Sequence, residues 1–78
     1  MEVWVVKFAD EVTLFATRKA AMSCVRYHVK VEMELTMKDM RVTKFKNTFW
    51  GDIAPVADYS SPEGEVISLL RQKVLTTW

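Results

Sequence analysis

Cysteine, histidine, glycine and proline are all scarce in this chain: one Cys, one His, two Gly and two Pro in 78 residues. The single Cys24 excludes a disulfide within the chain and a zinc site built from several cysteines. With so few glycines and prolines, long linkers and disordered tracts are not expected over most of the length. We therefore expect one folded domain spanning residues 1–78.

A predominant charge and long hydrophobic runs are missing as well. The 11 Lys and Arg residues nearly balance the 10 Asp and Glu residues, which argues against attraction of the whole chain to DNA or to an anionic membrane. The apolar start at residues 3–6 is interrupted by Lys7, and no stretch reaches the roughly 20 apolar residues of a membrane span. We expect a soluble cytoplasmic protein without a signal peptide, in which Cys24 is a reduced thiol.

Recognisable catalytic motifs are absent. There is no glycine-rich phosphate loop, no GxSxG and no HExxH. Cys24 and His28 are four residues apart on one predicted helix face, so they could touch, and a Cys–His pair can activate a thiolate. No acid at a recognisable spacing orients this pair, and its apolar neighbours indicate packing against a sheet. We expect no enzymatic activity, no cofactor and no metal site.

Apolar residues are plentiful, at 50% of the chain, and their pattern predicts the first half of the fold. Residues 3–8 and 12–16 are rich in β-branched and aromatic side chains, which indicates two strands joined as a hairpin. Thr17 can cap a helix, and residues 18–30 place apolar side chains at helical spacing. This pattern predicts an amphipathic helix lying on a sheet.

The segment RVTKFKNTFWGD (41–52) has the aromatic and basic content of a nucleic-acid-binding surface. Residues 31–36 just before it alternate between apolar and polar side chains, which predicts a strand turning at 38–40 and pairing with the strand that follows. In that register Glu34 lies opposite Lys44 and Glu32 opposite Lys46. The acids then neutralise the lysines, and the segment becomes an ordinary strand.

The remaining residues allow two interpretations. Residues 51–65 hold both prolines and both glycines and predict an irregular acidic loop. After it, SSPE (60–63) can cap a helix over residues 66–75. Alternatively, SPEG (61–64) is a turn with Pro62 in its second position, and residues 65–72 form a last strand. We favour the helix, which gives a single small α+β domain of order β-β-α-β-β-α, with helices packed mainly on one face of an antiparallel sheet.

Two charged surfaces are candidates for partner binding. A basic stripe on the predicted helix either binds phosphate or an acidic protein surface, or is an ordinary solvated face. Acidic residues of the predicted loop are either ordinary polar side chains or a surface for a basic partner, and the two surfaces together could join two copies as a homodimer. The stripe consists of Lys19, Arg26 and Lys30, and the acidic residues include Asp52, Asp58 and Glu63.

Tryptophans supply the third candidate surface. Trp4 lies in a buried type of strand, whereas Trp50 is in phase with the outward lysines and Trp78 ends the sequence. These two either form an exposed patch suited to an interface, or the C-terminal element covers Trp50. We expect exposure, because the charged outer face is a poor site for an apolar helix. Trp50→Ala should then cost within about 1 kcal/mol of stability.

The hairpin followed by FATRKAAMSCV (15–25) resembles small phage-encoded accessory proteins, in which a strand ending at an aromatic-x-Thr step leads into an Ala-rich helix. The resemblance covers the first half of the chain and brings no catalytic or binding residues with it. It implies a protein that binds a host enzyme, a transcription component or a defence complex in the host cytoplasm and inhibits or redirects it.

Together these features predict a non-enzymatic protein-interaction module. The alternative is a small nucleic-acid-binding protein that uses the basic stripe, extended by Lys44, Lys46 and Trp50.

Overall fold

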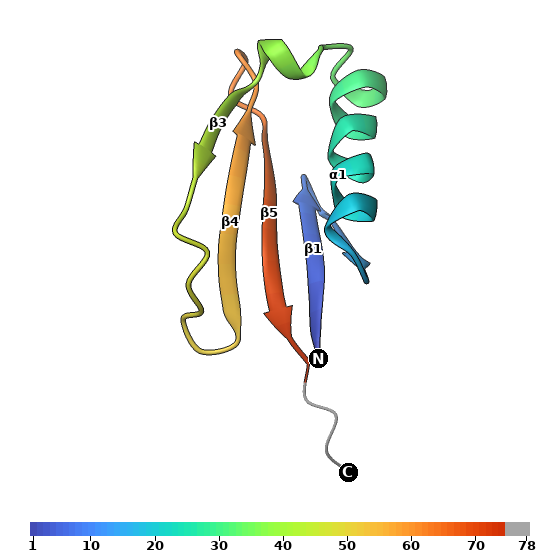
Figure 1. The fold of residues 1–78 in the computed structure, drawn as a ribbon. Coiled ribbons are helices and arrows are strands. Elements are labelled where there is room, and N and C mark those ends of the chain that lie inside the picture. The colour runs from blue at the N-terminus through green and yellow to red at the C-terminus, as the bar shows by residue number, and fades with distance from the viewer. Residues whose placement is uncertain (75–78) are drawn as a thin grey trace.

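The computed structural model describes residues 1–74 as a five-stranded antiparallel sheet with one α-helix on one face (Figure 1). The strand order is β2-β1-β5-β4-β3. The predicted α+β class is therefore confirmed, with one α-helix instead of two. The elements are β1 (Glu2–Phe8), β2 (Glu11–Phe15), α1 (Arg18–Tyr27), β3 (Arg41–Lys44), β4 (Ile53–Ser60) and β5 (Val66–Lys73).

The first half of the fold follows the sequence pattern. β1 and β2 form the expected hairpin, in which Trp4 pairs with Phe15 and Phe8 with Glu11. The hydroxyl of Thr17 accepts a hydrogen bond from the Ala20 amide at 3.2 Å, which satisfies one of the free amides of the first helical turn. The helix therefore begins where the cap predicts.

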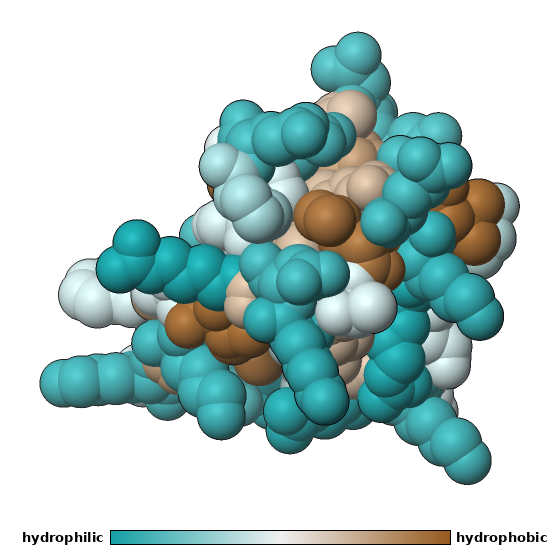
Figure 2. Space-filling view, turned by 90° about the horizontal axis from the view of Figure 1, so that it is seen from above, coloured by the Kyte–Doolittle hydropathy of each residue, from teal (hydrophilic) through white to brown (hydrophobic). Residues whose placement is uncertain are grey.

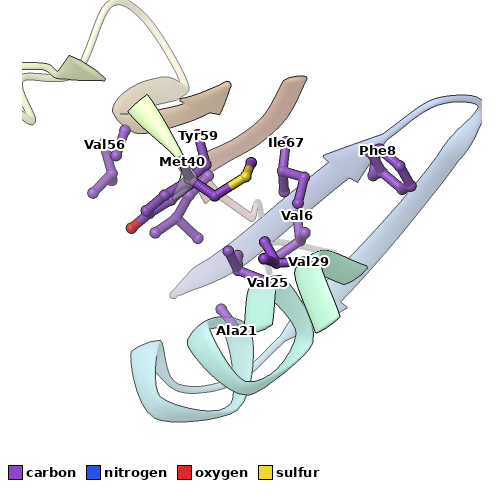
Figure 3. Packing of buried hydrophobic residues seen from close by; sticks show 11 residues of the cluster. Val6, Phe8, Ala21, Val25, Val29, Met40, Val56, Tyr59 and Ile67 are labelled. Carbon is purple, nitrogen blue, oxygen red and sulfur yellow. The ribbon is translucent and has the colours of Figure 1, made fainter. Parts of the chain in front are cut away.

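The hydrophobic core lies between α1 and the sheet (Figure 3). Ala21, Val25 and Val29 face the sheet with at most 1% exposure. From the sheet, Val6 and Phe8 on β1, Ile67 and Leu69 on β5, and Tyr59 on β4 meet them. Full burial of an aliphatic or phenyl side chain contributes about 1.5–3 kcal/mol, so this cluster supplies most of the stabilisation of the fold.

The predicted strand over residues 31–36 is wrong. The helix instead continues through a π-helical turn (His28–Glu32), in which the Met33 amide donates to the His28 carbonyl at 3.0 Å. A 3₁₀ turn (Met37–Asp39) follows, held by the Thr36 amide donating to Asp39 Oδ2 at 2.9 Å. The alternation misled because Met33, Leu35 and Met37 all pack against the core from an irregular segment.

The irregular loop predicted over residues 51–65 and the helix favoured over residues 66–75 are also wrong. Residues 53–60 are strand β4, in which Pro55 is tolerated because the register shifts between Pro55 and Ala57. Residues 66–73 form strand β5 and not a helix. The alternative interpretation, a last strand over residues 65–72, is therefore the correct one. The Gly64 amide donates to the Ser61 carbonyl at 3.0 Å, so Pro62 occupies the second position of a tight turn.

The predicted pairing of the basic segment is wrong as well. β3 pairs with β4, and Lys44 lies opposite Ala57 and not opposite Glu34. Glu32 ends the π-helical turn and is not opposite Lys46. The acidic neighbours expected to neutralise the two lysines are therefore elsewhere in the molecule.

The second face of the sheet, here called the open face, carries no helix from the described part of the chain. Register places Val5 of β1 between Leu14 and Leu70 on this face, and these neighbours reduce its exposure to 2%. Towards the edges the apolar side chains are exposed, among them Val12 at 58%, Leu14 at 60% and Ile53 at 44%. The open face therefore presents an uncovered apolar surface, consisting of Val3, Val5, Val12, Leu14, Ile53, Pro55 and Leu70.

Candidate functional site

The start of β1, the end of β5 and the segment after β3 lie at the end of the sheet where the N-terminus lies (Figure 1). Aromatic and basic side chains come together there from these segments, from the last residue of β3 and from the start of α1. We call this surface the basic aromatic end. It consists of Trp4, Arg18, Lys44, Phe45, Lys46, Phe49, Trp50, Arg71 and Lys73.

Cations and rings alternate across this end. The Arg18 guanidinium lies 5.9 Å from the centre of the Trp4 ring, and Arg71 lies 5.8 Å from the same ring. Arg71 is also 5.0 Å from the Phe49 ring, which in turn lies 4.6 Å from the Lys73 ammonium. Each such contact is worth about 0.5–1 kcal/mol at an exposed site. The row fixes three cationic groups side by side.

Arg71 joins the sheet to the segment that connects β3 and β4. Its Nε donates to Asn47 Oδ1 at 2.9 Å and its Nη2 to the Asn47 carbonyl at 3.3 Å. Its Nη1 lies 3.4 Å from Glu2 Oε1. Asn47 has a positive φ of 59°, a conformation that Asn tolerates better than most residues. The Arg71 contacts therefore hold the connecting segment in one shape.

Trp50 lies at the turn of this segment and is 81% exposed. The turn is closed by the Trp50 amide donating to the Ile53 carbonyl at 2.8 Å, and Gly51 within it has a φ of +66°. Phe45, 41% exposed, lines a hollow of about 320 Å³ together with Lys46, Trp50 and Pro55. The expected exposure of Trp50 is correct, although a turn and not a strand presents it.

A second hollow opens on the helix side of the same end. It measures about 200 Å³ and is lined by Arg18 and Lys44 together with Phe45, Asn47 and Tyr59. Within residues 1–74 neither Arg18 nor Lys44 forms an ion pair. The hollow is therefore lined by two cations without a described acidic partner and by the aromatic rings of Phe45 and Tyr59.

Acidic side chains concentrate at the opposite end. The β1–β2 turn carries Asp10, the segment after α1 carries Glu32 and Glu34, and the β4–β5 turn carries Glu63 and Glu65. Figure 2 looks down on this end and shows mainly hydrophilic side chains with hydrophobic ones between them. Lys30, Lys38 and Arg41 lie at this end as well, so it carries an excess of acids and not acids alone.

The predicted basic stripe is present but extends away from the basic aromatic end. Lys19, Arg26 and Lys30 are exposed, and none forms an ion pair with a described residue. Lys19 is next to Arg18 at the start of α1, whereas Arg26 and Lys30 line an apolar hollow with Leu35 near the helix end. The stripe is therefore split between the two ends.

The predicted acidic surface is not formed. Asp52 lies beside Trp50, Asp58 lies within β4 opposite Ser68, and Glu63 lies in the β4–β5 turn at the other end. The three were expected together because residues 51–65 were predicted as one loop, and strand β4 separates them. Trp78 lies outside the described residues.

Cys24 and His28 are placed on the helix face that the sequence predicts. Burial, then the negative charges of Glu11 and Glu32, raise the pKa of the Cys24 thiol above its ordinary value. An activated nucleophile needs a lowered pKa. His28 is 4% exposed, and its Nδ1 lies 3.0 Å from Glu32 Oε1, an acid that the predicted strand over residues 31–36 places elsewhere.

Several residues of the basic aromatic end were missed from the sequence. Arg71 lies within the helix favoured over residues 66–75, and a helix there does not place it opposite Trp4. Phe45 and Phe49 were placed in a paired strand. One signal was available. Arg71 and Lys73 are two residues apart, and residues at that spacing lie on the same face of a strand.

None of the helices in residues 1–74 is long and apolar enough to cross a membrane. No family model matches the sequence, and no curated protein or solved structure matches it.

Proposed function

We propose that this chain is a non-enzymatic binding protein whose basic aromatic end holds an acidic surface of another protein. The observation that carries the proposal is Trp50, 81% exposed beside lysines that lack acidic partners within the described residues. Tryptophan and arginine dominate the binding energy of protein interfaces, and Trp50 is not isolated, because Phe45 and Ile53 beside it are also exposed.

A protein partner fits better than a nucleic acid because the apolar surface extends past the cations. Trp50 bridges to Ile53, which begins β4 on the open face. From there the apolar surface continues through Pro55 to Leu70 and Leu14. Protein interfaces combine such an apolar area with a charged rim, whereas nucleic-acid binding needs mainly cations and stacking rings.

The non-enzymatic part of the proposal rests on chemistry. Burial and the charges of Glu11 and Glu32 raise the pKa of the Cys24 thiol, whereas a cysteine nucleophile needs a lowered pKa. The resemblance to small phage accessory proteins supplies a class of effect: binding a host enzyme, transcription component or defence complex and blocking or redirecting it. The protein would then act in the host cytoplasm.

Affinity capture with matched variants tests the proposal. The wild-type chain should retain a stoichiometric protein from host lysate, and Trp50→Ala should lose it while changing the free energy of unfolding by less than about 1 kcal/mol. Tyr27→Ala removes another exposed aromatic, 55% exposed and distant from Trp50, and should keep the partner. Equal capture by Trp50→Ala would remove Trp50 from the interface.

Charge reversal separates the cations from the tryptophan. Lys44→Glu with Lys46→Glu should weaken capture by tenfold or more, about 1.4 kcal/mol, because the partner's acids would face like charges. Lys38→Glu makes the same kind of change on the 3₁₀ turn and should have little effect. A double variant that binds as well as wild type would contradict an acidic partner.

Nucleic-acid binding is the second candidate, favoured by one observation: Lys44 and Lys46 are not neutralised by Glu34 and Glu32. Binding of a single-stranded oligonucleotide should then fall with the logarithm of salt concentration, with a slope of about −0.7 per phosphate contact. Leu14→Ser on the open face distinguishes the candidates. It should weaken a protein complex and leave oligonucleotide binding unchanged.

A further inference from the structure

Three potential metal ligands converge where the start of β2 meets the end of α1. Glu11 is the first residue of β2, His28 follows the last residue of α1, and Glu32 ends the π-helical turn. One nitrogen of His28 and one carboxylate oxygen from each glutamate all lie within 4.8 Å of one another. The basic aromatic end includes none of these residues.

The histidine of this group is buried and lacks a hydrogen bond. His28 is 4% exposed, and its Nδ1 has no hydrogen-bond partner. Glu32 Oε1 is only 3.0 Å from that nitrogen, but the alignment is not that of a hydrogen bond, so the short distance alone does not satisfy it. An unsatisfied buried nitrogen is costly and is uncommon in folded proteins. An electrophile placed between one ring nitrogen and the two carboxylates would satisfy these groups together.

The surroundings hold the imidazole in place. The Phe8 ring centre lies 4.9 Å from that of His28, and the Tyr27 ring packs edge-on at 5.8 Å. The wide turn at residues 28–32 is a π-helical irregularity, which in proteins is frequent at functional sites. The ligand that is hardest to reposition is thus already fixed, whereas Glu11 and Glu32 are exposed and free to adjust.

The donor set selects the type of ion. Imidazole favours zinc and related transition metals, whereas magnesium and calcium prefer oxygen ligands alone. Zinc binds nitrogen and carboxylate ligands at about 2.0–2.2 Å, so ligand atoms in a tetrahedral site lie roughly 3.5 Å apart. Rotation of the two exposed glutamates closes the difference from 4.8 Å.

We propose that Glu11, His28 and Glu32 bind one zinc ion, with the fourth position open to water. The ion joins the edge strand β2 to the end of α1 and neutralises two of the carboxylates at the acidic end. Its position is distinct from the basic aromatic end, so the proposal does not depend on the proposed function.

The test is zinc binding by the full chain, measured by competition with a chromophoric chelator. Cys24→Ser is used as the parent, so that zinc captured by the free thiol is not counted. We expect one zinc ion per chain. Glu11→Gln and Glu32→Gln should each weaken binding by about tenfold or more, since even residues that only support metal ligands change affinity by this factor. Glu34→Gln, an exposed glutamate two residues beyond Glu32, should change it less than about twofold.

Thermal unfolding gives a second readout that does not use a chelator. Zinc should raise the melting temperature of the Cys24→Ser parent, because a ligand that binds only the folded state stabilises it. The rise should disappear in Glu11→Gln, which is exposed and should fold without the ion. The proposal is overturned if the parent binds no zinc, if both glutamine variants bind as tightly as the parent, or if calcium binds equally well.

Discussion

Arg71 is the residue on which the basic aromatic end depends. It is half-buried, bonds to Asn47 twice, pairs with Glu2 and lies against two aromatic rings. A guanidinium can make all of these contacts at once because its donors lie in one rigid plane. The ammonium group of a lysine lacks such a planar set of donors and could not make them together. The geometry around Trp50 is therefore set by a residue that does not itself have to touch a partner.

Arg71→Lys is expected to lower the free energy of unfolding by about 1–2 kcal/mol, since the two hydrogen bonds to Asn47 are lost. Urea denaturation measures this change. Limited proteolysis should also cut faster within residues 45–52, because that segment loses its anchor. Lys73→Arg keeps the cation beside Phe49 and should leave both readouts unchanged; a similar loss there would show that general packing, and not the Asn47 contacts, is responsible.

Cys24 gives a prediction about pH. Because burial and the charges of Glu11 and Glu32 raise the pKa of its thiol, the reactive thiolate forms only at higher pH than in the unfolded chain. Alkylation by iodoacetamide at pH 8 should be slower in the folded protein than in urea. Glu11→Gln removes one negative charge, which should lower the pKa and shift the rate–pH profile towards lower pH. A profile at or below that of the unfolded chain would contradict the raised pKa.

At the scale of elements, β5 is the centre of the fold. It pairs with β1 on one side and β4 on the other, and its Ile67 and Leu69 are at most 1% exposed. The edge strands are short, with five residues in β2 and four in β3. Short edges limit unwanted pairing with other chains.

Hydrogen exchange should reflect this order. Amides of β1, β5 and β4 should exchange most slowly, because these strands are paired on two sides, and those of the edge strand β3 should exchange much faster. Exchange measured strand by strand checks the topology directly. Slow exchange confined to residues 31–36 would instead support the hairpin that the sequence alternation predicts.

Sequence patterns predicted the elements whose signals are local. Thr17 marks the helix start, and the β-branched composition of residues 3–8 marks the first strand. β5 was given only as the alternative to a helix, because VISLLRQK places apolar side chains on one helical half and also alternates as a strand. Only long-range pairing with β1 decides between them. The strand predicted over residues 31–36 is wrong for the opposite reason. Apolar side chains recur at every second residue there because they contact the core, although the segment pairs with no described strand.

The candidate site was predictable only in part. Trp50 was expected to be exposed because it is in phase with Lys44 and Lys46 on the outward face of a strand, and the structure exposes it at a turn instead. The convergence of Arg18, Lys44 and Arg71 was not expected, because it depends on the strand order. The contact of Glu32 with His28 was hidden for a related reason: the strand predicted over residues 31–36 places Glu32 opposite Lys46, whereas the π-helical turn places it beside the histidine.

At the scale of the whole molecule, one end of the sheet carries an excess of cations and the other an excess of acids. Two copies that join basic end to acidic end make a head-to-tail contact, and such a contact does not close into a symmetric dimer. At low ionic strength we therefore expect the apparent mass from sedimentation to rise gradually with concentration. Salt at about 0.15 M reduces the Debye length to about 8 Å and should abolish the effect. A discrete dimer that persists at that salt concentration would point instead to the open face.

The meeting of the two ends of the described chain has a practical consequence. The Val74 amide donates to the Met1 carbonyl at 2.9 Å, so Met1 and Val74 lie side by side at the basic aromatic end. An affinity tag, a fluorophore or a fused protein attached at Met1 would stand near Trp50 and compete with whatever binds there. The β4–β5 turn at Pro62 and Glu63 is exposed and lies at the far end of the sheet. A label inserted in that turn would leave the binding surface accessible.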